Sequence, residues 1–105
     1  MIKPDPALDP EWDEDNINHV AGHGLNPEQI EELYYGEGPH PTLALKNKKK
    51  RGKGEERYRL WGTDATGFFI EAVVAPYPDL GCWRCVTAFP MSLKTRKVYL
   101  KRIKK

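Results

Sequence analysis

The sequence has little cysteine, no long apolar run and almost no positive charge in its first part. Only 2 of its 105 residues are cysteine, too few for a disulfide framework, so we expect reduced thiols. The longest uncharged stretch, residues 16–27, has 12 mostly polar residues, whereas a bilayer-spanning helix needs roughly 20 apolar ones. Residues 1–10 lack the apolar core of a secretory signal. We therefore expect a cytoplasmic protein with no membrane span.

A single domain over residues 1–105 is the expected organisation, because this length holds one core and not two. Hydrophobic residues make up 39% of the chain and aromatic residues 10%, which argues against wholesale disorder. Prolines at positions 4, 6 and 10 predict an extended, loosely held N-terminal arm over residues 1–12. No cofactor is implied by this composition.

Charge divides the chain sharply. Residues 1–45 hold one base against ten acids, whereas residues 46–105 hold 16 bases against five acids. This asymmetry indicates a polyanionic partner for the basic part, with the acidic part either folding against it or facing solvent. The alternative is a charge pattern that serves solubility alone.

Local patterns predict three helices and a small antiparallel sheet. Asp13 is a candidate N-cap for a helix over residues 14–23, Asn26 caps a second helix with an apolar stripe, and Ser92 caps a third that ends near Ile103. Residues 46–54, which read KNKKKRGKG, are expected to form a mobile basic loop. The strand candidates are residues 42–45, 57–61, 68–75 and 83–89. Short connections between the last three favour antiparallel pairing and an α+β fold.

Four segments occur in the order known from one toxin family. They read EWDEDNINHVAGHGLNPEQIEEL, PTLAL, GEERYRLWG and VTA, the last preceding a basic helix that contains Tyr99. The chain thus resembles the BrnT type of bacterial ribonuclease toxin. The resemblance implies a RelE-like fold with its helices packed on an antiparallel sheet. It also implies a metal-independent ribonuclease of a toxin–antitoxin system, which acts on RNA or at the ribosome and is held by a cognate antitoxin protein.

Such cleavage needs a base for the 2′-OH, an acid for the leaving oxygen and cations around the phosphate. His23 matches the late helical histidine of the family and is the candidate acid or base, although a histidine at a helix end can equally be structural. Arg84, Lys94 and Arg96 are candidates for the cation at the scissile phosphate. Each can also be an ordinary surface or ion-paired residue.

The sequence departs from the family pattern after the last strand. Phe89 and Pro90 stand where similar toxins have arginine, and Thr95 stands where they commonly have glutamate. Phe89 carries no charge, so it either stacks on an RNA base or belongs to the core. The alternative function is therefore a catalytically silent RNA-binding or ribosome-binding module of the same fold.

RNA contacts are expected from the two basic segments. Residues 94–105 hold seven bases and no acid, a density suited to several phosphates. The candidate RNA-binding residues are Lys48, Lys49, Lys50, Arg51, Arg57, Phe89, Lys97 and Lys101.

Cysteine and histidine spacing leaves one further alternative. Cys82 and Cys85 form CxxC, and His19 with His23 forms HxxxH, so four zinc ligands of the right types exist. A zinc site would require the strand start to bring the thiols beside the first helix, and a redox CxxC normally opens a helix, whereas Val86 and Thr87 continue the strand pattern. Two reduced cysteines are the favoured interpretation.

Overall fold

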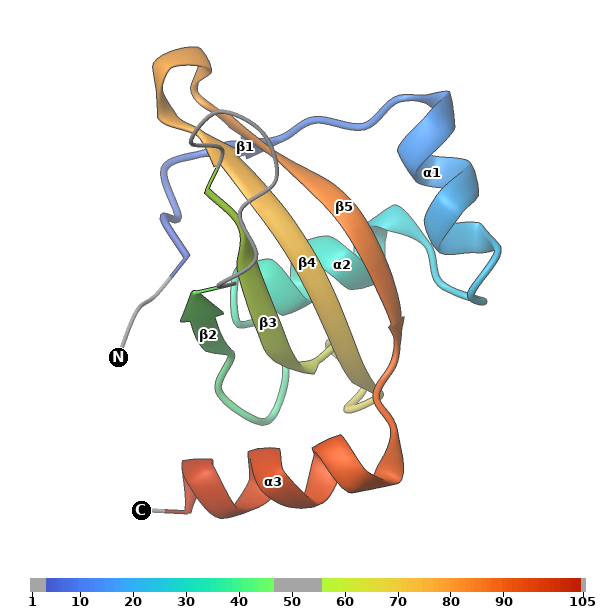
Figure 1. The fold of residues 1–105 in the computed structure, drawn as a ribbon, viewed down its shortest axis with the longest axis vertical. Helices are drawn as coiled ribbons and strands as arrows, with labels where there is room; N and C mark the ends of the chain where they lie inside the picture. The colour runs from blue at the N-terminus through green and yellow to red at the C-terminus, as the bar shows by residue number, and fades with distance from the viewer. Residues whose placement is uncertain (1–3, 47–55, 105) are drawn as a thin grey trace.

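The computed structural model describes residues 4–46 and 56–104, and these form an α+β fold (Figure 1). The expected strands correspond to β2, β3, β4 and β5, and a short strand β1 precedes them. The elements are β1 (Asp9–Pro10), α1 (Glu14–Ala21), α2 (Pro27–Tyr34), β2 (Leu43–Lys46), β3 (Tyr58–Thr63), β4 (Phe69–Tyr77), the 3₁₀ turn η1 (Pro78–Leu80), β5 (Cys82–Pro90) and α3 (Leu93–Ile103). The lysine-rich loop that the sequence predicts lies outside the described residues, apart from its first residue, Lys46.

All three helices begin at the polar caps that the sequence predicts. The Asp13 side chain accepts from the Asn16 backbone N–H, and the Asn16 side chain accepts from the Asp13 N–H in return. Asn26 and Gln29 form the same reciprocal cap on α2. The Ser92 hydroxyl caps α3. Each cap satisfies backbone donors that the first turn of a helix leaves unpaired.

The sheet is mixed, which corrects the expectation of a purely antiparallel one. Its strand order is β1-β5-β4-β3-β2, and all neighbours pair antiparallel except β1, which runs parallel to β5. The parallel pair arises because the chain segment before α1 returns along the edge of β5, placing Asp9 beside Cys82 and Pro10 beside Trp83. Strand β1 is only two residues long, so no local pattern in the sequence could reveal it.

The N-terminal arm is docked earlier than the prolines suggest. Leu8 is buried at 6% exposure, and the hydroxyls of Tyr34 and Tyr35 donate hydrogen bonds to the carbonyls of Asp5 (2.7 Å) and Leu8 (2.6 Å). The expectation of a loose arm as far as Trp12 is therefore wrong for the part from Asp5 onward. Two consecutive tyrosines at the end of α2 hold it.

The helices do not share one face of the sheet, which corrects the expected packing. Helix α2 lies behind the sheet against β3 and β4, α1 packs beside β5, and α3 crosses the far ends of the strands (Figure 1). The α2 side holds the larger core. Its buried residues are Leu8, Val20, Leu25, Ile30, Leu33, Tyr34, Ala44, Leu60, Ile70, Ala72, Val74, Trp83, Cys85 and Ala88. The α3 side holds a smaller cluster of Leu43, Trp61, Met91 and Tyr99.

Two features fix the sheet against α2. A Cβ atom on Gly62 would lie 2.7 Å from Leu33 Cδ1, so α2 approaches β3 closely only because that residue is glycine. The turn between β3 and β4 is organised by Asp64, whose carboxylate accepts from the backbone N–H groups of Thr66 and Phe68 and from the Gln29 side chain of α2. The turn and the helix are thereby tied together.

Candidate nucleic-acid interface

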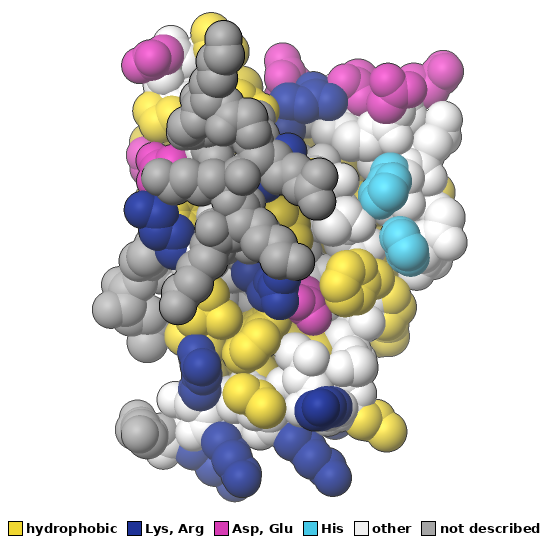
Figure 2. Space-filling model, viewed as in Figure 1, with side chains coloured by type: hydrophobic (Ala, Val, Ile, Leu, Met, Phe, Trp, Pro, Cys, Tyr) yellow, Lys and Arg dark blue, Asp and Glu magenta, His cyan; other side chains and the backbone are white. Residues whose placement is uncertain are grey.

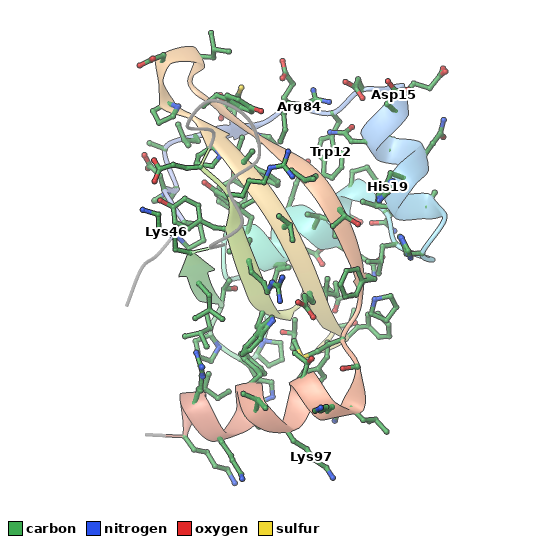
Figure 3. The ribbon with its side chains drawn as sticks, viewed as in Figure 1. Trp12, Asp15, His19, Lys46, Arg84 and Lys97 are labelled. Carbon is green, nitrogen blue, oxygen red and sulfur yellow. The ribbon has the colours of Figure 1, made fainter. Side chains whose placement is uncertain are left out.

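Two histidines lie together on an exposed surface beside β5, at the C-terminal end of α1. His19 is in the last turn of α1 and His23 follows in the turn after Ala21, and their ring centroids are 5.5 Å apart. His19 Nε2 is 2.9 Å from the Thr87 hydroxyl of β5, and the His23 ring meets the half-buried Phe89 ring edge-on at 6.0 Å. The two imidazoles are therefore held against the strand and open to solvent, as Figure 3 shows for His19.

An open depression of about 330 Å³ adjoins this pair. His19, Arg57 and Arg84 all line it, so it collects one imidazole and two guanidinium side chains from α1, the start of β3 and β5. Asp15 and Asn16 complete its α1 wall. The depression therefore combines cationic side chains with an acidic wall.

Arg84 is held by carboxylates of the N-terminal part. Its guanidinium donates to Asp13 Oδ2 at 2.6 Å and to Glu11 Oε1 at 3.2 Å (Figure 3). Hydrogen bonds from Asn16 and then Arg84 lower the pKa of Asp13, and the same two carboxylates raise the pKa of Arg84. This part of the basic half is therefore neutralised by the acidic half, and Arg84 anchors the chain that enters α1.

The cations of α3 have a different environment. The Arg96 guanidinium lies 4.1 Å from the centre of the Phe69 ring, and that of Arg102 lies 5.5 Å from the Trp61 ring. Both arginines are exposed, and within residues 4–46 and 56–104 no α3 cation pairs with a carboxylate. A cation–π contact orients a guanidinium group without neutralising its charge. Figure 2 shows Lys and Arg side chains gathered along this end of the molecule, with acidic side chains near the start of α1 at the other end.

The strand register places Phe89, which contacts His23, in one cross-strand row with Trp61, which contacts Arg102 of α3. Phe89 lies opposite Glu71 on β4, and Glu71 lies opposite Trp61 on β3. Glu71 is buried and paired with Arg59 at 3.4 Å. Its carboxylate therefore adds little unpaired negative charge between Phe89 and Trp61. We call the following set the ring–cation surface: His19, His23, Phe89, Phe69, Arg96 and Arg102.

The candidate catalytic residues are not all brought together. Arg84 lies near the start of β5 and pairs with Ala75, whereas Lys94 and Arg96 follow the end of the same strand. Pro90 lies six positions after Arg84 along β5, a distance of about 20 Å. His23 lies between them, beside Phe89. Arg84 and Arg96 therefore cannot grip one phosphate together.

The other RNA-binding candidates fall into three groups. Lys97, which Figure 3 labels, is exposed on α3. Lys94 and Lys101 of the same helix are also exposed. Arg57 is half-buried and lines the depression beside His19. Residues Lys48, Lys49, Lys50 and Arg51 lie outside the described residues.

Sequence reasoning undervalued His19, Phe69 and Trp61. The HxxxH spacing identified His19 only as a metal ligand, although the same spacing places it beside His23 for any purpose. Phe69 and Trp61 were expected as strand residues, and their arginine contacts depend on α3 folding back over the sheet, which no local pattern encodes.

The two cysteines are free thiols. Burial raises the pKa of Cys85 to about 12, and its thiol donates to the Thr87 carbonyl at 3.4 Å. Burial and then Glu11 raise the pKa of Cys82. Among the residues that the structure describes, no three His, Cys, Asp or Glu side chains are grouped so as to hold a metal ion. The structure thus gives no support to the four-ligand zinc alternative.

Comparison of the chain with protein-family models, with curated proteins and with solved structures finds no match. In the described part of the chain, no helix has the length and apolar character needed to cross a membrane.

Proposed function

We propose that this protein acts on RNA, binding a single strand along the ring–cation surface and cleaving it without a metal at His19 and His23. The observation that carries the proposal is the set of α3 cations that face solvent without carboxylate partners in the described structure, two of them held over aromatic rings. Cations in this state can exchange counterions for RNA phosphates. In this proposal the protein is a cytoplasmic, RelE-like toxin whose partner is a cognate antitoxin protein.

Binding of a single strand, rather than a duplex, is favoured by the exposed rings. His23 is exposed and Phe89 half-buried, and their rings are in edge contact. Unstacked bases pack on such rings, whereas the bases of a duplex are stacked on each other and out of reach. Phe89 then has a role in RNA binding that does not require the arginine of similar toxins.

Cleavage is supported by the histidine pair. An imidazole can serve as base or acid in such a reaction. His19 and His23 provide two imidazoles within one surface, and Arg57 lines the depression beside His19. No metal is needed for this reaction.

A catalytically silent RNA-binding module is the second candidate. It is favoured by the state of Arg84, whose charge is taken up by Glu11 and Asp13, and by the neutral Phe89 near the histidines. In this case RNA is bound by the same α3 cations and leaves intact.

Incubation of the purified protein with labelled single-stranded RNA in a chelator separates these functions. We expect fragments from the wild-type protein, and their loss in His19→Ala and His23→Ala while RNA is still bound through the α3 cations. His40→Ala is the matched control, because His40 packs on Phe69 at 5.7 Å and lies outside the pair. Salt-sensitive binding with no fragments favours the silent module. If the wild-type protein neither binds nor cuts RNA, both candidates are wrong.

A further inference from the structure

A second cavity, of about 170 Å³, lies far from the ring–cation surface. It is on the α2 side of the sheet, near the start of β3 and beside the N-terminal arm, whereas α3 packs against Trp61 and Phe69 at the other end of the strands. The lining residues are Pro4, Asp5, Leu8, Tyr34, Ala44, Glu56, Tyr58, Leu60, Val74, Pro76 and Pro78. The RNA proposal uses none of them.

The cavity has an apolar interior and an acidic rim. Leu60 and Val74, which are 0% and 2% exposed, belong to its deep wall. Asp5 and Glu56 are exposed and belong to its mouth. Among the described lining residues none is positively charged. Apolar side chains therefore form the interior of the cavity and carboxylates form its rim. An apolar part of a ligand fits inside, and a positively charged group fits at the mouth.

The walls are already ordered. The Tyr34 ring stacks on Trp83 with centroids 4.1 Å apart and planes within 5°. Its hydroxyl donates to the Asp5 carbonyl at 2.7 Å, and the Asp5 carboxylate accepts from the Ala7 N–H at 2.9 Å. A site with walls of this kind loses little conformational freedom when a ligand enters.

Two groups at the mouth favour a cation. The Tyr58 hydroxyl donates to Glu56 Oε2 at 3.3 Å, so an aromatic side chain and a carboxylate meet at the mouth. Lys46 also reaches Glu56, at 3.7 Å, with side-chain exposures of 55% and 50%. An ion pair this exposed is weak, so an ammonium ligand can displace it.

We propose that this cavity binds a small arylalkyl ammonium ion, with the aromatic end against Leu60 and Val74 and the ammonium group at the mouth beside Asp5 and Glu56. The cavity volume is below the ~300 Å³ typical of sites for drug-sized ligands, which restricts the ligand to a single ring with a short chain. A lysine side chain from another protein is a poorer fit, because it would carry its charge into the apolar interior first.

Titration of the ¹⁵N-labelled full chain with three probes tests this assignment by NMR. The probes are 2-phenylethylamine, its neutral analogue 2-phenylethanol and the anion phenylacetate. We expect saturable amide shifts at Leu8, Leu60 and Val74 with the amine, and an affinity at least about tenfold higher than that for phenylacetate. Equal affinity for all three probes, or no saturable shift with the amine at millimolar concentration, would overturn the proposal.

Two variants test which residues of the cavity bind the amine. Glu56→Gln changes an exposed side chain and should weaken amine binding about threefold to tenfold without affecting 2-phenylethanol. Glu37→Gln, an exposed glutamate outside the cavity, is the matched control and should bind like the wild type. Ala44→Leu fills the cavity and should abolish binding of both ligands, with unchanged α3 resonances reporting a folded chain. Amine binding unaffected by either Glu56→Gln or Ala44→Leu would contradict the assigned site.

Discussion

The two sides of the sheet differ in how much they bury and in how their charges are used. On the α2 side, a large core surrounds Trp83, which is fully buried and stacked on Tyr34. On the α3 side, four residues form the buried cluster and Tyr99 is its one fully buried side chain. The α2 side therefore supplies most of the buried apolar area that stabilises the fold. Helix α3 is held by the few side chains of the smaller cluster.

Arginine shows the same contrast. Arg84, near α1, is bound by two carboxylates, whereas Arg96 and Arg102 of α3 lie over aromatic rings. An arginine neutralised by carboxylates can stabilise the fold but offers little to a phosphate. An arginine supported by a ring keeps its charge for a ligand. The positive charge of the second half is thus divided into a structural part and a part available for binding.

The strongest test of this contrast is Trp83→Ala. It removes the centre of the α2-side core and should lower the free energy of unfolding by about 3–5 kcal/mol, measured by urea denaturation. Leu80→Ala is the control, because Leu80 is 76% exposed and its loss should change stability by less than about 0.5 kcal/mol. A similar, small effect of both changes would mean that the α2-side core does not dominate.

Replacing Lys94, Lys97 and Lys101 together by glutamine tests the charge contrast. We expect RNA affinity to fall by about tenfold to a hundredfold at low salt, and the slope of log K against log salt to decrease by about two, because each lost phosphate contact removes roughly 0.7. Fluorescence anisotropy at several salt concentrations measures both. Arg84→Gln should leave the slope unchanged; a larger effect from this change than from the triple variant would reverse the assignment.

Asp64→Asn tests how firmly α2 is tied to the β3–β4 turn. Burial alone would raise the pKa of Asp64, but hydrogen bonds from Gln29, Thr66 and Phe68 outweigh it and lower the pKa below 3.8. A lowered pKa in the folded state means that the carboxylate adds stability above pH 3.8 and loses it as the pH falls through the folded-state value. The variant should be less stable at pH 7 by about 1–2 kcal/mol, and the difference should shrink in acid. A difference independent of pH in denaturation curves would contradict this.

The smallest effect is expected from Tyr99→Phe. It removes the hydroxyl that donates to the Pro41 carbonyl at 2.6 Å and should cost about 1 kcal/mol. Tyr34→Phe is its counterpart on the α2 side, because that hydroxyl also donates to a backbone carbonyl. Equal costs would show that the two sides differ in buried area and not in the strength of single hydrogen bonds. A much larger cost for Tyr99→Phe would mean that this bond is the main anchor of α3.

The candidate site was only partly accessible to sequence reasoning. The helix expected over residues 14–23 places His19 and His23 on one side, although α1 ends at Ala21, and the basic composition of α3 is plain in the sequence. The ion pairs of Arg84 with Glu11 and Asp13 could not be predicted from the sequence, because the partners are about seventy positions apart. The contact of His23 with Phe89 likewise needed α1 to pack on β5.

The sequence by itself determined the three helices, the four longer strands and the division of charge between the two halves. Each of these depends on residues close in the chain: a polar cap, an alternating pattern or a run of like charges. Only the tertiary structure decided that β1 joins the sheet in parallel, that α2 and α3 pack in different places, and which cations are neutralised. These outcomes depend on pairings between distant segments, whose free energies come from packing in three dimensions and leave no periodic trace along the chain.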